Sequence, residues 1–490
     1  MIQAQMMIGG SAASASDGAV FDAVDPFDGT AWGTVPAATA ADVDAAVRAA
    51  REAFPGWRDT PGIRRAELMH RLADAIEREA DRLAEWESTD NGKVIRETRP
   101  QMSFVARNVR FFAGYADKLY GRTIPLDTPT MFDYTVRRPF GVCALITAWN
   151  SPLALLANKL PPALATGNTV VIKPSEHASI TTTELARIAA EVGFPPGVIN
   201  VVTGDGLVGD ALTRHPDVDK ISFTGGGPTG RRIASNAAER LVPVSLELGG
   251  KSPNIVFADA DLDRAVQGAV AGIFGAAGQT CVAGSRLLVE RSAYAHVRDA
   301  VSARARQVRL GDPRDRATEM GPVANRPQFE RILSIIDAAR GAGATATAGG
   351  NRAEGADLER GFFIEPTVFA DVDPDSTLAQ EEVFGPVLAI IPFDDEAEAI
   401  RIANGTGFGL AAGVWTNDLA RSFRLTNALD AGVVWVNTYR ASAAQAPFGG
   451  TKQSGYGRER GEEALEDYTY VKNVMVDTSS EARDPFVIRT

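Results

Sequence analysis

The chain has 490 residues and a mass of 52.0 kDa, more than one hydrophobic core usually supports, so we expect at least two domains. Its 50 basic and 62 acidic residues give a net charge of -12, and the basic residues form no block typical of nucleic-acid binding. These properties exclude nucleic acid as an expected partner.

The N-terminal and most apolar segments give no indication of a secreted or membrane protein. Residues 1–10 lack the basic segment and apolar core of a signal peptide, so a cytoplasmic location is expected. The most apolar stretch, 265–278, is too short to cross a bilayer and contains Gln267. Its GxxxG spacing, from Gly268 to Gly272, is interpreted as close helix packing in a core rather than as dimerisation in lipid.

In chain order, amphipathic helices come first and an alternating pattern follows. Apolar residues recur at helical spacing from Val43 to Phe54 and again from Leu68 to Leu83. From about residue 142, short β-branched runs alternate with helical stretches such as 182–192. This alternation predicts βαβ units and a parallel sheet covered on both faces. The predicted strands are 142–146, 169–172, 198–202 and 220–223.

A second alternating region extends from about residue 254 to residue 436 and predicts a second α/β domain. Its apolar segments are 254–257, 286–289, 388–392 and 432–436. The segments 131–138 and 472–476 fit neither domain and have the pattern of extended, partly exposed strands. Because exposed strand edges pair readily with another chain, we expect these two segments to form an oligomer interface.

The cysteines and histidines indicate a nucleophile and no metal. Cys143 falls in a predicted buried strand, whereas Cys281 ends the run Gly278-Gln279-Thr280-Cys281, among Gly and polar residues. In a chain with two cysteines, we interpret Cys281 as a nucleophile. Two cysteines form no disulfide framework, which favours a reducing compartment. The four histidines are scattered without metal-ligand spacing, so no metal site is expected.

A nucleophilic thiol needs a base, because a free cysteine with a pKa of about 8.5 is mostly protonated at neutral pH. Histidine would serve in a Cys/His hydrolase, the lesser alternative, but nothing in the sequence places one near Cys281. Glu247 ends an apolar run and precedes two glycines, so burial at a strand end would raise its pKa toward that of a general base. The alternative for Glu247 is a solvated carboxylate, or one paired with Lys251.

Ten short segments of the chain together resemble the aldehyde dehydrogenase superfamily, in the family's order and along nearly the whole length. They are Ala148-Trp149-Asn150-Ser151-Pro152, Gly167-Asn168-Thr169, Lys173-Pro174-Ser175-Glu176, Gly193-Phe194-Pro195-Pro196-Gly197-Val198, Phe223-Thr224-Gly225, Leu246-Glu247-Leu248-Gly249-Gly250, Gly278-Gln279-Thr280-Cys281, Glu381-Glu382-Val383-Phe384-Gly385-Pro386, Pro447-Phe448-Gly449-Gly450 and Ser454-Gly455-Tyr456-Gly457-Arg458-Glu459.

The resemblance implies an α/β fold of three parts. A Rossmann-like NAD-binding domain would comprise residues 1–120 and 140–247, and an α/β catalytic domain residues 248–448. A small β element for oligomerisation would comprise residues 121–139 and the tail 468–490. Residues 449–467 would return to the body of the molecule, and a homodimer or homotetramer is implied.

The resemblance also implies a mechanism. Cys281 would attack an aldehyde, and the Asn150 amide with the Cys281 N–H would stabilise the oxyanion. Hydride transfer to NAD would leave a thioester, which Glu247 would hydrolyse as general base; such a base argues against acyl transfer to coenzyme A. Lys159 and Glu459 match positions that surround this base or relay protons, the alternatives being a solvated lysine and a helical surface glutamate.

The cofactor residues are those that the resemblance to the family implies, rather than those of the usual dinucleotide fingerprint, a strand followed by GxGxxG. The pyrophosphate would lie at the helix after Phe223, where glycines permit close approach, although a glycine triplet alone is typical of a flexible turn. The Glu176 carboxylate would favour NAD and repel the extra phosphate of NADP, which remains possible as a cofactor. The implied cofactor residues are Trp149, Lys173, Glu176, Gly225, Gly226, Glu382 and Phe384.

The substrate pocket is expected to be wide and polar. Small polar residues stand where relatives that oxidise apolar aldehydes have aromatic rings, and Phe448 remains as the aromatic. Arg440 would pair with a substrate carboxylate or hydroxyl, or else form a surface or intersubunit salt bridge. The candidate pocket residues are Ser151, Asn158, Thr280, Arg440, Ser442 and Phe448.

The sequence thus predicts an NAD-dependent enzyme that oxidises a polar or ring-bearing aldehyde or semialdehyde to the acid. Two alternatives stay open. One is a semialdehyde dehydrogenase that prefers NADP, and the other is a non-catalytic binding protein that retains the fold.

Overall fold

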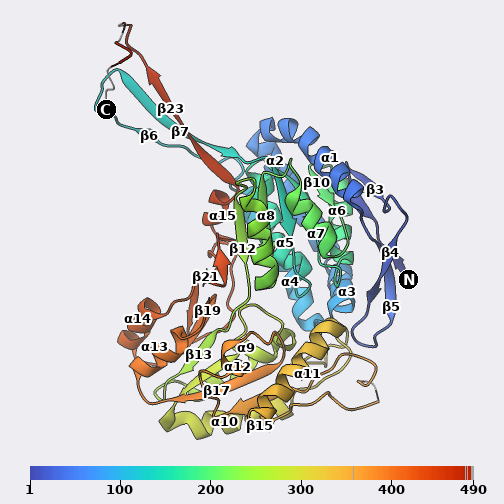
Figure 1. Ribbon diagram of the computed structural model, residues 1–490, viewed down its shortest axis with the longest axis vertical. Coiled ribbons are helices and arrows are strands. Elements are labelled where there is room, and N and C mark those ends of the chain that lie inside the picture. The colour runs from blue at the N-terminus through green and yellow to red at the C-terminus, as the bar shows by residue number, and fades with distance from the viewer. Residues whose placement is uncertain (357, 481, 483, 487–490) are drawn as a thin grey trace.

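Two large sheets, one in each half of the molecule, organise the chain (Figure 1). The structure is a computed structural model that describes residues 1–356, 358–480, 482 and 484–486. The first sheet has eight strands in the order β22-β12-β11-β8-β9-β10-β2-β3, of which the five from β12 to β10 are parallel. Its strands are β2 Met6–Ile8, β3 Ser11–Ala13, β8 Val142–Ile146, β9 Thr169–Lys173, β10 Ile199–Val201, β11 Lys220–Thr224, β12 Val244–Glu247 and β22 Gly455–Tyr456.

Helices cover both faces of the first sheet, because alternate residues of its strands point to opposite sides. Cys143 and Leu145 of β8 pack with helices α2 to α6, whereas Val142 and Ala144 pack with α1, α7 and α8. The helices are α1 Ala40–Asp59, α2 Gly62–Arg78, α3 Ala80–Asn91, α4 Ile95–Ala113, α5 Pro152–Ala165, α6 Ile180–Glu191, α7 Gly206–Arg214 and α8 Gly227–Ala238. All five residues of β8 are buried, as its continuous apolar run predicts.

The second sheet has seven strands in the order β15-β16-β17-β14-β13-β19-β20. Helices α9 and α10 pack on one face, and α11 to α14 pack on the other. The strands are β13 Pro253–Val256, β14 Arg286–Glu290, β15 Thr345–Ala348, β16 Thr367–Ala370, β17 Val387–Phe393, β19 Ala411–Trp415 and β20 Val433–Val436. The helices are α9 Leu262–Phe274, α10 Arg291–Arg306, α11 Arg326–Gly341, α12 Thr377–Gln380, α13 Glu396–Asn404 and α14 Leu419–Ala428.

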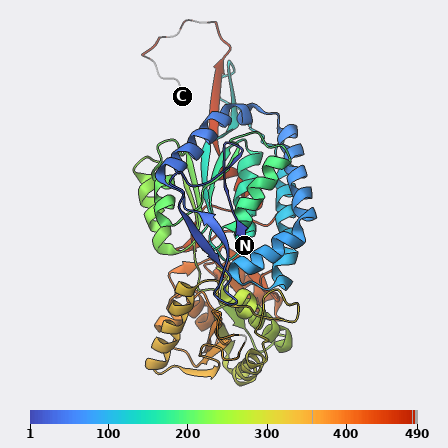
Figure 2. The ribbon, with the colours of Figure 1, turned by 90° about the vertical axis from the view of Figure 1, so that its right-hand side faces the viewer.

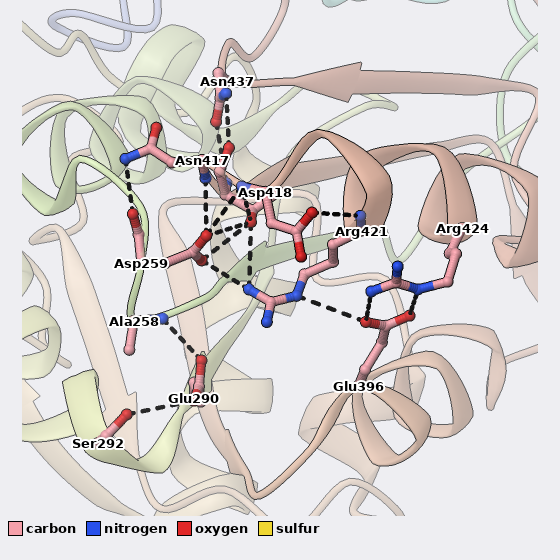
Figure 3. Close-up of polar contacts among 11 residues, drawn as sticks. Ala258, Asp259, Glu290, Ser292, Glu396, Asn417, Asp418, Arg421, Arg424 and Asn437 are labelled. Atoms are coloured by element: carbon pink, nitrogen blue, oxygen red, sulfur yellow. Dashed lines mark hydrogen bonds and ion pairs between the residues drawn. The ribbon is translucent and has the colours of Figure 1, made fainter.

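A polar cluster joins helices α13 and α14 to the loop after β13 (Figure 3). The Asp259 carboxylate accepts hydrogen bonds from Thr416 Oγ1 and from the Asn417 and Asp418 backbone, and Arg421 Nη1 lies 2.7 Å away. Arg421 in turn lies 3.6 Å from Glu396 on α13. Every charge in this cluster has a partner within the protein, so we assign it a structural role.

The strands β7 Met131–Pro139 and β23 Thr469–Asp477 pair along their whole length as an antiparallel ribbon, with β6 Thr123–Ile124 beside β7. This ribbon extends away from the body of the molecule (Figures 1 and 2). It contains both segments that the sequence predicts as exposed strands. In the predicted tail 468–490, residues 481, 483 and 487–490 lie outside the described residues.

Smaller elements complete the chain. Strands β1 Ile2–Gln3, β4 Val20–Val24 and β5 Ala31–Pro36 form a three-stranded sheet, and β18 Phe408–Gly409 pairs with β21 Thr451–Lys452. The remaining helices are the 3₁₀ turn η1 Gly275–Gly278 and α15 Glu463–Glu466.

Most predicted elements occur within one to three residues of their expected ends, and α/β architecture with parallel sheets is confirmed. The apolar pattern from Leu68 to Leu83 belongs to two helices instead of one, because the chain breaks at Glu79 between α2 and α3. The GxxxG glycines pack as predicted: a side chain at Gly268 would overlap Trp415, and one at Gly272 would meet Tyr439. In the part of the chain that the structure describes, no helix has the length and apolar character needed to cross a bilayer.

Candidate active site

Cys281 follows a strained turn between the two large sheets. After α9, residues Ala276 and Ala277 of η1 adopt φ of 52° and 51°, a left-handed conformation that costs a non-glycine residue roughly 1–2 kcal/mol. The turn directs the chain back toward the loop after β12: a Cβ on Gly250 would lie 2.7 Å from the Cys281 carbonyl oxygen. The second sheet thus supplies the thiol and the first sheet supplies the wall beside it.

Burial raises the pKa of the Cys281 thiol to about 12. The Glu382 and Glu247 carboxylates raise it further, and the positive charge of Arg460 opposes them. The thiol is therefore protonated at neutral pH and needs a base to become nucleophilic. Cys143 lies fully buried in β8, where burial also raises the pKa of its thiol, so it is no competing nucleophile.

Glu247 is the last residue of β12 and is buried, with 3% of its surface exposed. Neither carboxylate oxygen has a hydrogen-bond partner among the described residues. Burial raises the pKa of Glu247 well above its usual 4.5, and the neighbouring Glu459 raises it further. Both alternatives for this residue are excluded, since the carboxyl is not solvated and makes no ion pair with Lys251 within the described chain. A buried carboxyl without a partner can act on a water molecule.

The Asn150 side chain joins the two halves of the site. Its Nδ2 donates a hydrogen bond of 2.8 Å to the backbone oxygen of Gln279, two residues before the thiol. Asn150 lies in the loop after β8, so this bond fixes the nucleophile turn against the first sheet. An amide nitrogen carries two hydrogens, and the second remains available to an oxyanion.

Lys159 and Glu459 form a buried pair behind Glu247. Lys159 on α5 makes an ion pair with Glu459, and its Nζ donates to Ser222 Oγ at 3.1 Å. Asn158 Nδ2 donates to the other oxygen of Glu459 at 3.0 Å. The lysine is fully buried and the glutamate is 3% exposed in a loop, so the solvated and helical surface alternatives are excluded. The pair lies near enough to Glu247 for Glu459 to raise the pKa of that carboxyl.

The start of α8 has the properties of an anion site. A side chain at Gly225 would overlap the Phe223 ring, so only glycine fits there. At Gly226, by contrast, an added Cβ would meet only Pro228 Cδ, at 3.9 Å. No side chain caps the helix, so its first N–H groups can bind a phosphate.

Lys173 and Glu176 form a group of their own at the end of β9. Lys173 is buried, and its Nζ donates to the Pro174 oxygen at 3.0 Å and lies 3.6 Å from Glu176 Oε2. Burial lowers the pKa of Lys173. The Glu176 side chain is 38% exposed, so its carboxylate can accept hydrogen bonds from ribose hydroxyls.

Glu382 and Phe384 lie on the thiol side. Glu382 accepts a hydrogen bond of 3.0 Å from the Gly250 N–H, and burial raises the pKa of its carboxyl to about 7. Phe384 has φ of 54° and meets the Trp149 ring edge to face at 5.3 Å. A cavity lined by Gly250, Thr280, Glu382 and Phe384 opens here. The donors, glycines and carboxylates of these groups fit a dinucleotide.

The candidate substrate residues differ in their partners. Ser151 Oγ donates to the Asn150 oxygen at 2.7 Å, and the Thr280 hydroxyl is buried without a partner among the described residues. Arg440 is engaged by protein groups: it lies 3.5 Å from Glu97 and donates to the Ala271 oxygen at 3.2 Å. Ser442 and Phe448 both contact Arg460.

Sequence reasoning missed the contribution of α4 and of the residue after Glu459. Lys93 donates to Ser151 Oγ and to Gln101 Oε1, and Arg460 lies over the ring of Phe104 at 5.3 Å. The turn Asn91-Gly92 before Lys93 was visible as a helix boundary, and Arg460 follows a recognised motif directly. No pattern in either segment indicates that the charges of Lys93 and Arg460 act on Cys281. Within the described chain, no group of three or more His, Cys, Asp or Glu could hold a metal ion.

Two sheets, each with a run of parallel strands, and a thiol at their junction define an α/β protein with an enzyme-like site. The aldehyde dehydrogenase family model matches residues 13–474, so the chain belongs to the aldehyde dehydrogenase family. It is 45% identical, over 100% of both chains, to (Z)-2-((N-methylformamido)methylene)-5-hydroxybutyrolactone dehydrogenase of Acinetobacter baylyi. It is 46% identical to an aldehyde dehydrogenase of Emericella nidulans, over 94% of this chain and 92% of the other.

Solved structures agree with this assignment. The betaine aldehyde dehydrogenase of Staphylococcus aureus, solved in complex with NAD+, superposes with a TM-score of 0.97 at 40% identity. The match covers 99% of this chain and 97% of that one. The aldehyde dehydrogenase fold is therefore confirmed, and the chain is an oxidoreductase of this family.

Proposed function

We propose that this enzyme uses NAD to oxidise a polar or ring-bearing aldehyde or semialdehyde, releasing the acid by hydrolysis of a thioester on Cys281. The observation that carries the proposal is Glu247, whose buried carboxyl has both oxygens without a partner in the described chain and interacts electrostatically with the thiol. A base in this position serves hydrolysis. Transfer of the acyl group to coenzyme A would not need it.

In the first step, Cys281 Sγ bonds to the aldehyde carbon and its proton goes to Glu247. The carbonyl oxygen becomes an oxyanion, which accepts hydrogen bonds from the Asn150 amide and the Cys281 N–H. Each such donor typically contributes about 3–4 kcal/mol to lowering the barrier. When bound, NAD supplies the hydride acceptor that takes the carbon to the oxidation level of an acid.

Before the second step, Glu247 passes on the proton that it took from the thiol. It then removes a proton from water, whose oxygen attacks the thioester carbon. The carbon–sulfur bond breaks, the Cys281 sulfur takes up one of these protons to restore the thiol, and the acid leaves. The protons collected by Glu247 leave along Glu459 and Lys159, which are linked to each other and to Ser222. Burial and the nearby Glu459 both raise the pKa of Glu247 above its usual value, which makes the carboxylate a stronger base.

NAD would be held by the groups around β9, α8 and Glu382. Gly225 and the start of α8 would bind the pyrophosphate, and Glu176 with Lys173 the adenosine ribose. Glu382 would bind the nicotinamide ribose, with Phe384 and Trp149 near the ring. The carboxylate of Glu176 supports NAD over NADP, as does the NAD+ complex of the Staphylococcus relative. A semialdehyde enzyme that prefers NADP is the competing proposal.

We also propose a homodimer or homotetramer assembled through the β7–β23 ribbon. Large apolar side chains stand exposed on these strands, namely Phe132, Tyr470, Val471, Met475 and Val476. Exposed apolar edges of this kind are typical of strand pairing between chains. The three-part domain division is part of this proposal, and two free thiols agree with a cytoplasmic enzyme.

A panel of aldehydes with NAD and with NADP tests the proposal, monitored by absorbance of the reduced nucleotide. We expect oxidation with NAD, a lower kcat/KM with NADP, and no oxidation by Cys281→Ala. Better turnover with NADP would favour the competing enzyme. No nucleotide reduction with any aldehyde would favour a non-catalytic protein.

A further inference from the structure

Two cations near the thiol lack a carboxylate partner. Among the described residues, neither Arg460 nor Lys93 has an acidic side chain within ion-pair distance, whereas Arg440 is paired with Glu97. Each interacts electrostatically with Cys281, and each contacts a candidate substrate residue: Arg460 contacts Phe448, and Lys93 contacts Ser151. Lys93 is buried and Arg460 is partly buried. A charge removed from water without an ion-pair partner is costly to a fold, which suggests that a ligand supplies the missing negative charge.

Arg460 is held in place for such a ligand. Its guanidinium lies over the ring of Phe448, 4.5 Å away, and over the ring of Phe104 on α4. Nη1 donates to the exposed Ser442, and the buried Nε has no hydrogen-bond partner in the described chain. The backbone of Arg460 is left-handed, with φ of 58°. The two rings therefore orient a guanidinium whose hydrogen-bonding capacity is only partly used.

Lys93 adds positive charge from the α4 side. Its ammonium donates to the Ser151 hydroxyl and lies 3.3 Å from Gln101 Oε1, so only neutral groups contact it directly. Glu87 and Glu97 influence it from farther away. With Arg460, it places two cations near a thiol whose other neighbours, Glu247, Glu382 and Glu459, are acidic.

Building on the proposed function, we infer that the substrate is an aldehyde that carries a carboxylate remote from its carbonyl, and that Arg460 binds this carboxylate. A guanidinium fork matches the two oxygens of a carboxylate and is a rigid, permanently charged donor. A neutral aldehyde would leave the charge unpaired. The substrate class is therefore the ω-oxo carboxylates, the semialdehydes of dicarboxylic acids, rather than uncharged polar aldehydes.

The test compares each acid with its own methyl ester. The probes are 4-oxobutanoate, 5-oxopentanoate and 6-oxohexanoate, each beside its ester, with NAD as cofactor. For at least one chain length we expect the parent enzyme to favour the acid in kcat/KM by about 10- to 100-fold, the range of a charge-assisted hydrogen bond. In Arg460→Gln this acid-to-ester ratio should fall to about 1, and Arg460→Lys should keep part of it.

Two controls isolate the effect. Arg424→Gln removes an exposed arginine that pairs with Glu396 far from the thiol, and its acid-to-ester ratio should equal that of the parent. Calorimetric binding of the same acids and esters to Cys281→Ala measures recognition without turnover, so the inference is tested even if no aldehyde is oxidised. A parent ratio of 1 or below in both assays, or a ratio unchanged in Arg460→Gln, would overturn the inference. Loss of turnover with retained preference in binding would overturn only the proposed function.

Discussion

Glu247→Gln is the substitution that separates the two chemical steps. The amide keeps the size of the carboxyl in a site where Gly449 approaches closely, so packing should survive: a Cβ on Gly449 would lie 2.8 Å from Glu247 Oε1. Without the base, hydrolysis of the thioester should slow by about 10²- to 10⁴-fold, the usual contribution of a general base. The thiol can still lose its proton to solvent, slowly at neutral pH because the pKa of Cys281 is about 12.

Stopped-flow absorbance should then show one reduced nucleotide per active site, formed in a burst whose rate rises with pH, followed by a slow steady state. Mass spectrometry of the stalled enzyme should find the acyl group on Cys281. A steady-state rate within threefold of the parent, or a stalled enzyme without an adduct on that thiol, would refute the assignment of Glu247 as the hydrolytic base.

The same substitution changes stability with a definite sign. The native carboxyl holds its proton more tightly than the unfolded chain does, so the free energy of unfolding falls as the pH rises from 4.5 through the raised native pKa. Glu247→Gln removes the titrating carboxyl, so the variant does not lose this stability as the pH rises. The variant should therefore gain stability relative to the parent across that window, by up to about 1.4 kcal/mol for each pH unit, and gain nothing below pH 4.5. Denaturant unfolding at a series of pH values measures this difference.

Two further predictions concern the thiol and the anion site. Native enzyme without cofactor should react with iodoacetamide about 10³-fold more slowly at neutral pH than a free thiol, because burial raises the pKa of Cys281 to about 12. The rate should rise about tenfold per pH unit, and a rate that levels off below pH 9 would contradict this prediction. Cys281→Ser serves as the unlabelled control. Gly225→Ala should lower Tm and weaken NAD binding measured by calorimetry, because the added methyl overlaps Phe223 and overpacking typically costs about 1–3 kcal/mol. In the matched variant Gly226→Ala the methyl enters open space, so this variant should keep the parent Tm.

The strands were predictable because a strand that is buried on both faces has a continuous run of apolar residues. The run 142–146 coincides with β8, whose five residues are all buried. The break between α2 and α3 was not predictable, since the apolar spacing continues across Glu79 and only the packing of the two helices separates them. Apolar periodicity indicates which face of a helix is buried, but it does not indicate where the helix axis changes direction.

Local patterns also predict the candidate nucleophile, the candidate base and the glycines of the anion site, because each of these predictions depends on a few adjacent residues. The partners of these groups depend on the tertiary fold. Nothing within the segment around Glu247 shows that Glu459 lies beside it, or that the ion pair of Glu459 with Lys159 is buried. Arg440 is a further example: the sequence left open a substrate contact and a salt bridge, and the fold pairs Arg440 with Glu97 on α4.

The electrostatic balance at Cys281 connects the base to the proposed carboxylate site. In the free enzyme Arg460 lowers the pKa of the thiol, against the three carboxylates that raise it. Once Arg460 is paired with a substrate carboxylate, its charge is neutralised and that help is lost, so ionisation of the thiol becomes harder at the moment when the aldehyde arrives. Glu247 must then take the thiol proton directly. A buried carboxyl with a raised pKa and no hydrogen-bond partner among the described residues would meet this requirement of the proposed mechanism.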